Sequence, residues 1–232
     1  KLAKMKPRPG PDYILEGNPD SPTFPSRAKL NELIKRPLYA NSYKSYPNDL
    51  VKVKQKQDNV QLAGMVEAVD QSLGTLISKL KEHDLEDNTI VIFMSDNGGM
   101  SVMNGTPGRV VPQKQLDTAT SSSNLPLRGA KGWLYEGGIR VPMIASWPGH
   151  IESNSKSDHL SAFYDVLPTM CDIIGLPIPD QTDGISLLPT LLNNSQKKKH
   201  EYLYWEFPAY NGQQAVRFGK WKGIRKDIFD GN

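Results

Sequence analysis

Apolar side chains recur at helical spacing between residues 62 and 80, with polar residues between them. The positions are Leu62, Met65, Val66, Val69, Leu73, Leu76, Ile77 and Leu80. A repeat of three and four residues places such side chains along one face of a helix. The pattern therefore predicts an amphipathic helix that ends near His83.

A continuous apolar run follows this helix at Thr89-Ile-Val-Ile-Phe-Met94. Short runs rich in β-branched residues are typical of strands covered on both faces. A second core strand is expected at Arg140 to Trp147. Because a helix followed by a buried strand is the repeating unit of a parallel sheet, the fold class predicted is α/β.

The remaining pattern divides the chain into three parts. Residues 1–57 are proline-rich and predict irregular structure with one short helix near Ala28 to Ile34. Residues 58–195 form the predicted α/β core, including a helix at Ala162 to Ile174. Residues 196–232 begin an antiparallel C-terminal subdomain, with strands at 202–207 and 214–224.

Charge and composition limit the partners of the chain. The formal net charge is +3, and the clearest basic run, Lys197 to His200, is interpreted as a solvated loop. We therefore expect no nucleic-acid partner. No apolar run approaches the roughly 20 residues of a membrane span, so no membrane partner is expected either. The oligomeric state does not follow from the sequence.

Asp96 and Asn97 come directly after the first predicted strand. Ligands of open α/β sheets bind beyond the carboxyl ends of strands. A carboxylate and an amide oxygen are hard ligands suited to Ca²⁺ or Mg²⁺. Asp-Asn-Gly is also ordinary turn chemistry, and the spacing alone leaves both interpretations open.

Lys131 lies in the glycine-rich stretch from Leu127 to Pro142. Glycines let the backbone approach a ligand closely, and an ammonium group there could meet an anion. A surface lysine in a loop is the plainer alternative. Glu136 and Arg140 are interpreted as an ion pair or hydrogen-bonded group that fixes this loop.

Several motifs in order carry a resemblance to a known family. They are Met65-Val-Glu-Ala-Val-Asp70, Asn88 to Gly98, Leu127-Arg-Gly-Ala-Lys131-Gly, Tyr135-Glu-Gly-Gly-Ile-Arg-Val-Pro142, Trp147-Pro-Gly, Asp165-Val-Leu-Pro-Thr169, Gly175, Asp183-Gly184 and Ala215 to Lys222. Together they resemble the sulfatases of the alkaline-phosphatase superfamily over roughly residues 58 to 225.

This resemblance implies a fold and a site. The fold would be part of an alkaline-phosphatase-like sandwich, with a mostly parallel sheet and a small C-terminal antiparallel sheet. Asp96 and Asn97 match the family's metal ligands, which bind Ca²⁺, and Lys131 matches its sulfate-contacting lysine. The patterns around Asp165 to Thr169 and Tyr135 to Pro142 would serve packing and loop geometry.

The family's nucleophile is a formylglycine made from a Cys/Ser-x-Pro-x-Arg sequence, and this chain does not contain one. Thr23-Phe-Pro-Ser-Arg matches this motif only by chance, because threonine stands at the modified position. Cys171 is not followed by the proline and arginine of the motif. No catalytic residue is therefore assigned. The two leading aspartates of the family's metal site and its upstream histidine are also missing. We expect weak or no metal binding and negligible hydrolysis by this chain alone.

Three functions remain open from the sequence. The first is the C-terminal portion of a sulfatase that acts on a sulfated small molecule or glycan, with a carbohydrate or aryl alcohol as leaving group. The second is a phosphodiesterase or phosphonate hydrolase of the same superfamily. The third is a non-catalytic module that binds anions around Lys131. The resemblance alone suggests a periplasmic or secreted location.

Overall fold

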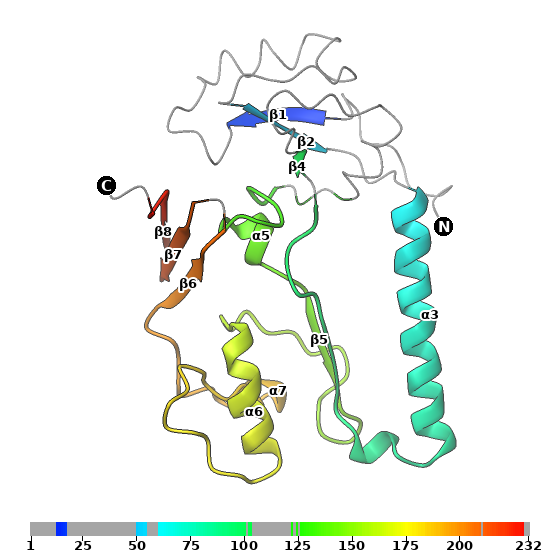
Figure 1. The fold of residues 1–232 in the computed structure, drawn as a ribbon. Coiled ribbons are helices and arrows are strands. Elements are labelled where there is room, and N and C mark those ends of the chain that lie inside the picture. Colours follow the sequence, from blue (N-terminus) through cyan, green and yellow to red (C-terminus); the bar gives the residue numbers. More distant parts are fainter. Residues whose placement is uncertain are drawn as a thin grey trace.

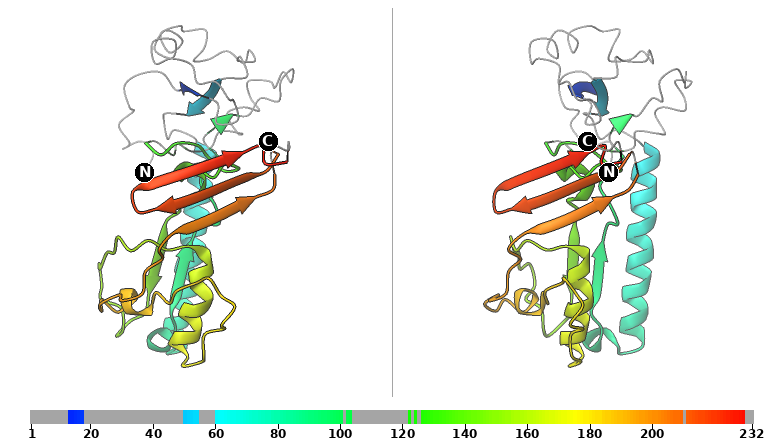
Figure 2. Two further views of the ribbon diagram at one scale, coloured as in Figure 1. Left: turned by 90° about the vertical axis from the view of Figure 1, so that its left-hand side faces the viewer. Right: turned by 60° about the vertical axis from the view of Figure 1, so that its left-hand side comes forward.

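The computed structural model describes strands at 13–17 and 50–54, and then residues 60–100, 102–103, 122, 124, 126–209 and 211–229. One long helix, a pair of core strands, two small sheets and several short helices make up these parts (Figure 1). In both figures the core strands lie between the long helix and a shorter helix, α6 (Figure 2). None of the described helices has the length and apolar character needed to span a bilayer.

The long helix, α3, runs from Val60 to Glu82 and confirms the predicted amphipathic helix. It ends in a Schellman motif: the Leu85 N–H donates to the Leu80 carbonyl at 2.8 Å and the Asp84 N–H to the Lys81 carbonyl at 3.2 Å. Asp84 takes the left-handed conformation that this motif requires, at φ 55°. The helix therefore stops where the sequence pattern stops.

The apolar face of α3 is only partly covered in the described structure. Its C-terminal half lines an open groove of about 460 Å³ together with β3, through Leu73, Ile77 and Leu80. Farther toward the N-terminus, Met65 and Val66 are 65% and 60% exposed. A large apolar surface on α3 therefore faces solvent.

The core strands are β3, Val91–Met94, and β5, Met143–Ser146. They pair antiparallel, with Val91 opposite Ser146 and Met94 opposite Met143. Both strands are confirmed, but the expected burial on both faces is wrong, because Phe93 and Ile144 are 38% and 64% exposed in the described structure. The mostly parallel sheet is not seen in the described residues, where every strand pairing is antiparallel. An apolar run predicts that a strand forms, and it carries no information about which neighbour pairs with it.

A small sheet includes two strands of the opening segment. β1, Tyr13–Gly17, pairs antiparallel with β2, Leu50–Lys54, which in turn pairs with β4, Val102–Met103. The first 57 residues were expected to be irregular, so these strands are a departure from the prediction. The short helix expected near Ala28 to Ile34 lies outside the described residues.

The C-terminal antiparallel sheet is confirmed and contains β6, Leu203–Phe207, β7, Gln213–Phe218, and β8, Trp221–Lys226, in that order. The single strand expected at 214–224 is a hairpin, because Gly219 turns the chain at φ 55°. Alternate residues of β7 face inward: Gln213 and Ala215 are 0% and 2% exposed. Figure 1 shows this sheet beside the short helix α5.

The predicted helix at Ala162 to Ile174 is also confirmed. It consists of a 3₁₀ turn, η3, at Phe163–Asp165, followed by α6 at Val166–Ile173. The chain leaves it through Gly175, whose positive φ of 70° suits a helix end. Two further short elements are η2, Glu86–Asn88, and α7, Leu188–Leu191.

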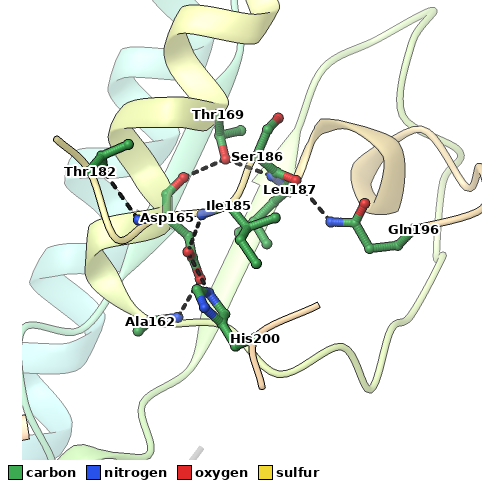
Figure 3. A network of polar contacts seen from close by, with 10 residues as sticks. Ala162, Asp165, Thr169, Thr182, Ile185, Ser186, Leu187, Gln196 and His200 are labelled. Carbon is green, nitrogen blue, oxygen red and sulfur yellow. Dashed lines mark hydrogen bonds and ion pairs between the residues drawn. The ribbon is translucent and has the colours of Figure 1, made fainter. Parts of the chain in front are cut away.

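A buried polar network ties α6 to the residues that follow it (Figure 3). The fully buried Asp165 accepts hydrogen bonds from the Ala162 and Ile185 N–H groups, each at 2.7 Å. Its Oδ1 also lies 2.7 Å from Nε2 of His200. Thr169 donates to the Asp165 carbonyl at 2.6 Å and accepts from the Leu187 N–H at 2.8 Å. Packing is thus the role of this motif, as its resemblance implied.

The prediction that Lys197 to His200 form a solvated loop is wrong for His200. Lys197, Lys198 and Lys199 are exposed, whereas the His200 side chain is 8% exposed. A buried carboxylate requires a partner, and His200 provides it. The composition of the run gives no sign that His200 is buried while the lysines are exposed.

We expect Asp165→Ala to lower the free energy of unfolding by about 3 kcal/mol or more, because two part-buried N–H groups and the His200 side chain lose their acceptor together. Urea denaturation measures the change. Asp158→Ala is the matched control, since Asp158 is exposed in the same part of the chain. Equal midpoints for the two variants would contradict the role given to Asp165.

Stability should also depend on pH through His159. Burial lowers the pKa of His159 from its ordinary value of 6.5, and attraction to Asp165 only partly opposes this. The unfolded chain then binds more protons than the folded chain, so the free energy of unfolding should fall as pH decreases from 6.5 toward the folded pKa. His159→Gln should flatten this slope in urea titrations between pH 5 and 7.5. An unchanged slope would show that His159 is not its source.

Candidate functional site

Two loops meet at the end of β3, and backbone hydrogen bonds join them directly. The Gly98 N–H donates to the Gly138 carbonyl at 2.8 Å, and the Lys131 N–H donates to the Gly99 carbonyl at 3.2 Å. A Cβ atom at Gly98 would lie 1.8 Å from the Gly137 carbonyl oxygen. Only glycine at position 98 allows the two backbones to approach this closely.

The amide of Asn124 fastens the same two loops. Its Nδ2 donates to the Gly99 carbonyl at 2.8 Å and to the Gly137 carbonyl at 3.0 Å. Sequence analysis missed this residue. It lies in a loop-like stretch that offers no periodicity, and an amide that bridges two distant carbonyls has no spacing signature.

The second loop continues into α5, Glu136–Ile139. The Gly137 N–H donates to the Arg128 carbonyl at 2.7 Å, and the Arg128 guanidinium lies 4.3 Å from the centre of the Tyr135 ring. Ala130, Trp133 and Leu134 are 1%, 3% and 6% exposed. The loop is therefore a packed structure, from which the exposed Lys131 projects.

The three predicted site residues lie on these joined loops. Asp96 is exposed and Asn97 is half-buried, directly after β3. The hydroxyl of Ser95 donates to the Asn97 carbonyl at 2.9 Å, which shapes the turn. Gly99, three residues after Asp96, accepts the hydrogen bond from Lys131. The backbone thus brings the segments together, and a single pocket shared by the three side chains stays a prediction.

Glu136 does not pair with Arg140, contrary to the sequence-based expectation. Its carboxylate accepts hydrogen bonds from Lys222 at 2.8 Å and from Arg217 at 3.4 Å, both on the C-terminal sheet. Burial lowers the pKa of Lys222, and the hydrogen bond with Glu136 opposes this shift. Arg140 is the basic residue near Glu136 in sequence, whereas the partners of Glu136 in the structure are more than 80 residues away.

Gln213 is the second residue that sequence analysis missed. Its fully buried amide donates from Nε2 to the Gly132 carbonyl at 3.0 Å and accepts from the Leu134 N–H at 3.4 Å. A glutamine at the start of a predicted strand gives no signal of such a contact.

Asp96 and Asn97 fit part of a calcium site. Both offer oxygen atoms, and the exposed position of Asp96 leaves its carboxylate accessible to an ion. Ca²⁺ takes about six to eight oxygen ligands, so other groups would have to complete the shell. The described part of the chain holds no group of three or more His, Cys, Asp or Glu arranged to bind a metal ion.

Comparison with known families identifies the chain. The sulfatase family model matches residues 35–176, and the model for the C-terminal region of N-sulphoglucosamine sulphohydrolase matches residues 130–230. The chain belongs to the sulfatase family. The first match spans both loops of the site, and the second begins one residue before Lys131 and runs through the C-terminal sheet.

Individual sulfatases show the same relationship. Human arylsulfatase A is 35% identical over 159 residues, which are 66% of this chain and 28% of that protein. The solved structure of Ps i-CgsB in complex with k-i-k-neocarrahexaose is 30% identical with a TM-score of 0.60, over 74% of this chain and 35% of that one. A second structure, solved with its substrate D-glucosamine-2-N,6-O-disulfate, is 26% identical with a TM-score of 0.53, over 68% of this chain and 29% of that one. The chain thus spans about a third or less of these sulfatases.

Two phosphonate monoester hydrolases, from Silicibacter pomeroyi and Agrobacterium radiobacter, are also similar in structure. Their sequence identities are 20% and 22%, with TM-scores of 0.51 and 0.52. This likeness shows a shared fold alone. Together with the sulfatase structures, it supports the alkaline-phosphatase-like fold.

We expect Gly98→Ala to lower the free energy of unfolding by about 2 to 3 kcal/mol, because the new methyl group overlaps the Gly137 carbonyl. Gly74→Ala is the matched control, since α3 has free space there, and it should instead stabilise the chain by about 0.5 to 1 kcal/mol. Chemical denaturation measures both. A Gly98→Ala variant as stable as the wild type would show that the loops do not meet as described.

Proposed function

We propose that the protein carrying this chain hydrolyses sulfate esters, and that the chain supplies part of the metal and sulfate site. The observation that carries the proposal is the hydrogen-bonded junction of the two loops that hold Asp96, Asn97 and Lys131. Membership of the sulfatase family supplies the reaction class.

Each of the three residues has a role in this proposal. Asp96 and Asn97 provide oxygen ligands for Ca²⁺, which when bound would withdraw charge from the sulfate oxygens. The Lys131 ammonium binds a sulfate oxygen as a compact point charge. Because charge grows on these oxygens in the transition state, a fixed ammonium there stabilises the transition state more than the bound ester.

The nucleophile would come from outside these 232 residues. No Cys/Ser-x-Pro-x-Arg sequence occurs in the chain, so we propose that formylglycine is supplied by another segment. Without a nucleophile the covalent route is closed altogether. The chain alone should therefore bind sulfate without turnover.

A sulfated saccharide is the substrate class we favour, with an aryl sulfate as the alternative. One similar structure holds D-glucosamine-2-N,6-O-disulfate as its substrate, and another holds a neocarrahexaose. The relationship to arylsulfatase A keeps the aryl alternative open.

The positions of the histidines favour a sulfatase over a phosphonate hydrolase, whose second metal needs more histidine and aspartate ligands. His83 follows α3, His150 stacks on Trp147 with ring centres 4.0 Å apart, and His200 binds Asp165. His159 also lies near Asp165 and His200, but the described residues contain no group of three or more His, Cys, Asp or Glu that could hold a metal ion. A non-catalytic anion-binding module would share the Lys131 site, and only turnover by the whole protein separates it from an enzyme.

Lys131→Ala should weaken binding of inorganic sulfate to the chain by about tenfold or more, since a charge-assisted contact contributes roughly 1.5 to 3 kcal/mol. Isothermal titration calorimetry measures the affinity. Lys156→Ala, which removes an equal charge from an exposed position, should leave it unchanged. In the whole protein, Lys131→Ala should abolish hydrolysis of an aryl sulfate. Full activity in that variant would exclude the assigned role.

Calcium binding by the chain alone should be weak or undetectable, because two side-chain oxygens cannot replace the ion's hydration shell. Calorimetric titration with Ca²⁺ tests this, with Asp96→Ala as the comparison. Micromolar affinity that disappears in Asp96→Ala would show that the chain holds a complete site.

A further inference from the structure

The C-terminal sheet contacts the Lys131 loop through one face of its hairpin. Gln213 and Arg217 are four residues apart on β7, so they point to the same side of the sheet. Arg217 lies directly opposite Lys222 of β8. All three side chains bind residues 132 to 136. The hairpin therefore holds this loop through three polar side chains on one face, with the buried Ala215 between two of them.

The Gln213 amide holds the peptide groups next to Lys131. It binds the Gly132 carbonyl and the Leu134 N–H, on either side of the buried Trp133. On the other side, the Lys131 N–H is bound to the Gly99 carbonyl. The backbone that carries the ammonium is thus fixed at both ends.

A cluster of charges also fixes the loop at Glu136, two residues after Leu134. Arg217 and Lys222 are like charges directly opposite each other, an arrangement that destabilises a sheet. The single carboxylate of Glu136 accepts from both and offsets their repulsion. Their side chains are only 29% and 15% exposed, so the pairing is shielded from solvent. An ordinary surface hairpin has no need of this arrangement.

We propose that the C-terminal sheet sets the position of the Lys131 ammonium, and that Gln213, Arg217 and Lys222 are positioning residues for sulfate binding. This inference rests on the proposed function, because it takes Lys131 as the sulfate ligand. None of the three residues needs to touch the anion. They act through Glu136 and through the backbone of residues 132 to 134.

The hairpin offers a matched pair of lysines for the test. Lys222→Met removes a positive charge that binds Glu136, and Lys220→Met removes one that is exposed at the turn of the same hairpin. Lys222→Arg keeps the charge and the donor. Arg217→Gln is a milder second variant, because its contact with Glu136 is longer and more exposed. A folding failure of Lys222→Met therefore does not end the test.

Two measurements are made on the 232-residue chain. Calorimetry gives the affinity for inorganic sulfate, and hydrogen exchange gives the protection of the amides of residues 130 to 134. We expect Lys222→Met to weaken sulfate binding by about tenfold and to speed this exchange, with a smaller effect for Arg217→Gln. Lys222→Arg should restore both to within about threefold of the wild type, and Lys220→Met should change neither.

The outcomes separate this inference from the proposed function. If Lys131→Ala binds sulfate as well as the wild type does, the proposed function fails and the inference fails with it. If Lys131→Ala loses sulfate but Lys222→Met and Arg217→Gln keep wild-type affinity, only the positioning role is overturned. Equal weakening by Lys220→Met and Lys222→Met would also overturn it, since general charge would then explain the effect.

Discussion

The close approach of two glycine-containing loops is the constraint on which the candidate site depends. Gly98 lies against the Gly137 carbonyl at a distance that no side chain would allow. This contact places the turn after β3 next to the loop that carries Lys131, and Asn124 fastens both. The segments that carry Asp96 and Lys131 lie some thirty residues apart in sequence, and this contact brings their backbones together. Glycine at position 98 permits this approach, and hydrogen bonds of the backbone and of Asn124 hold the two segments together.

Two polar centres, each with a fully buried side chain, tie further parts of the described structure together. Asp165 joins α6 to the segment that leads into the C-terminal sheet (Figure 3). Gln213 and Glu136 join that sheet to the Lys131 loop. Buried polar groups must be satisfied, so each centre specifies one arrangement of the chain in a way that apolar packing alone would not.

Sequence reasoning predicted the elements better than it predicted their partners. α3, β3, β5 and α6 could each be predicted from their own residues, α3 from its helical spacing and β3 from its continuous apolar run. The antiparallel pairing of β3 with β5 depends on chain direction in space, which periodicity does not encode. Glu136 shows the same limit. The predicted partner, Arg140, is near in sequence, whereas the two residues that bind the Glu136 carboxylate are distant. Asn124, Gln213 and His200 act through buried hydrogen bonds, which leave no local pattern.

The contacts that hold the Lys131 loop have a consequence for the order of folding. Leu134 and Gln213 are 79 residues apart, and Glu136 and Lys222 are 86 apart. Closing such long loops costs chain entropy before any contact forms. During synthesis the ribosome must also release the final hairpin before either contact can exist. The Lys131 loop can therefore mature only after β7 and β8 have been made, and a nascent chain lacking this hairpin would carry the lysine without its support.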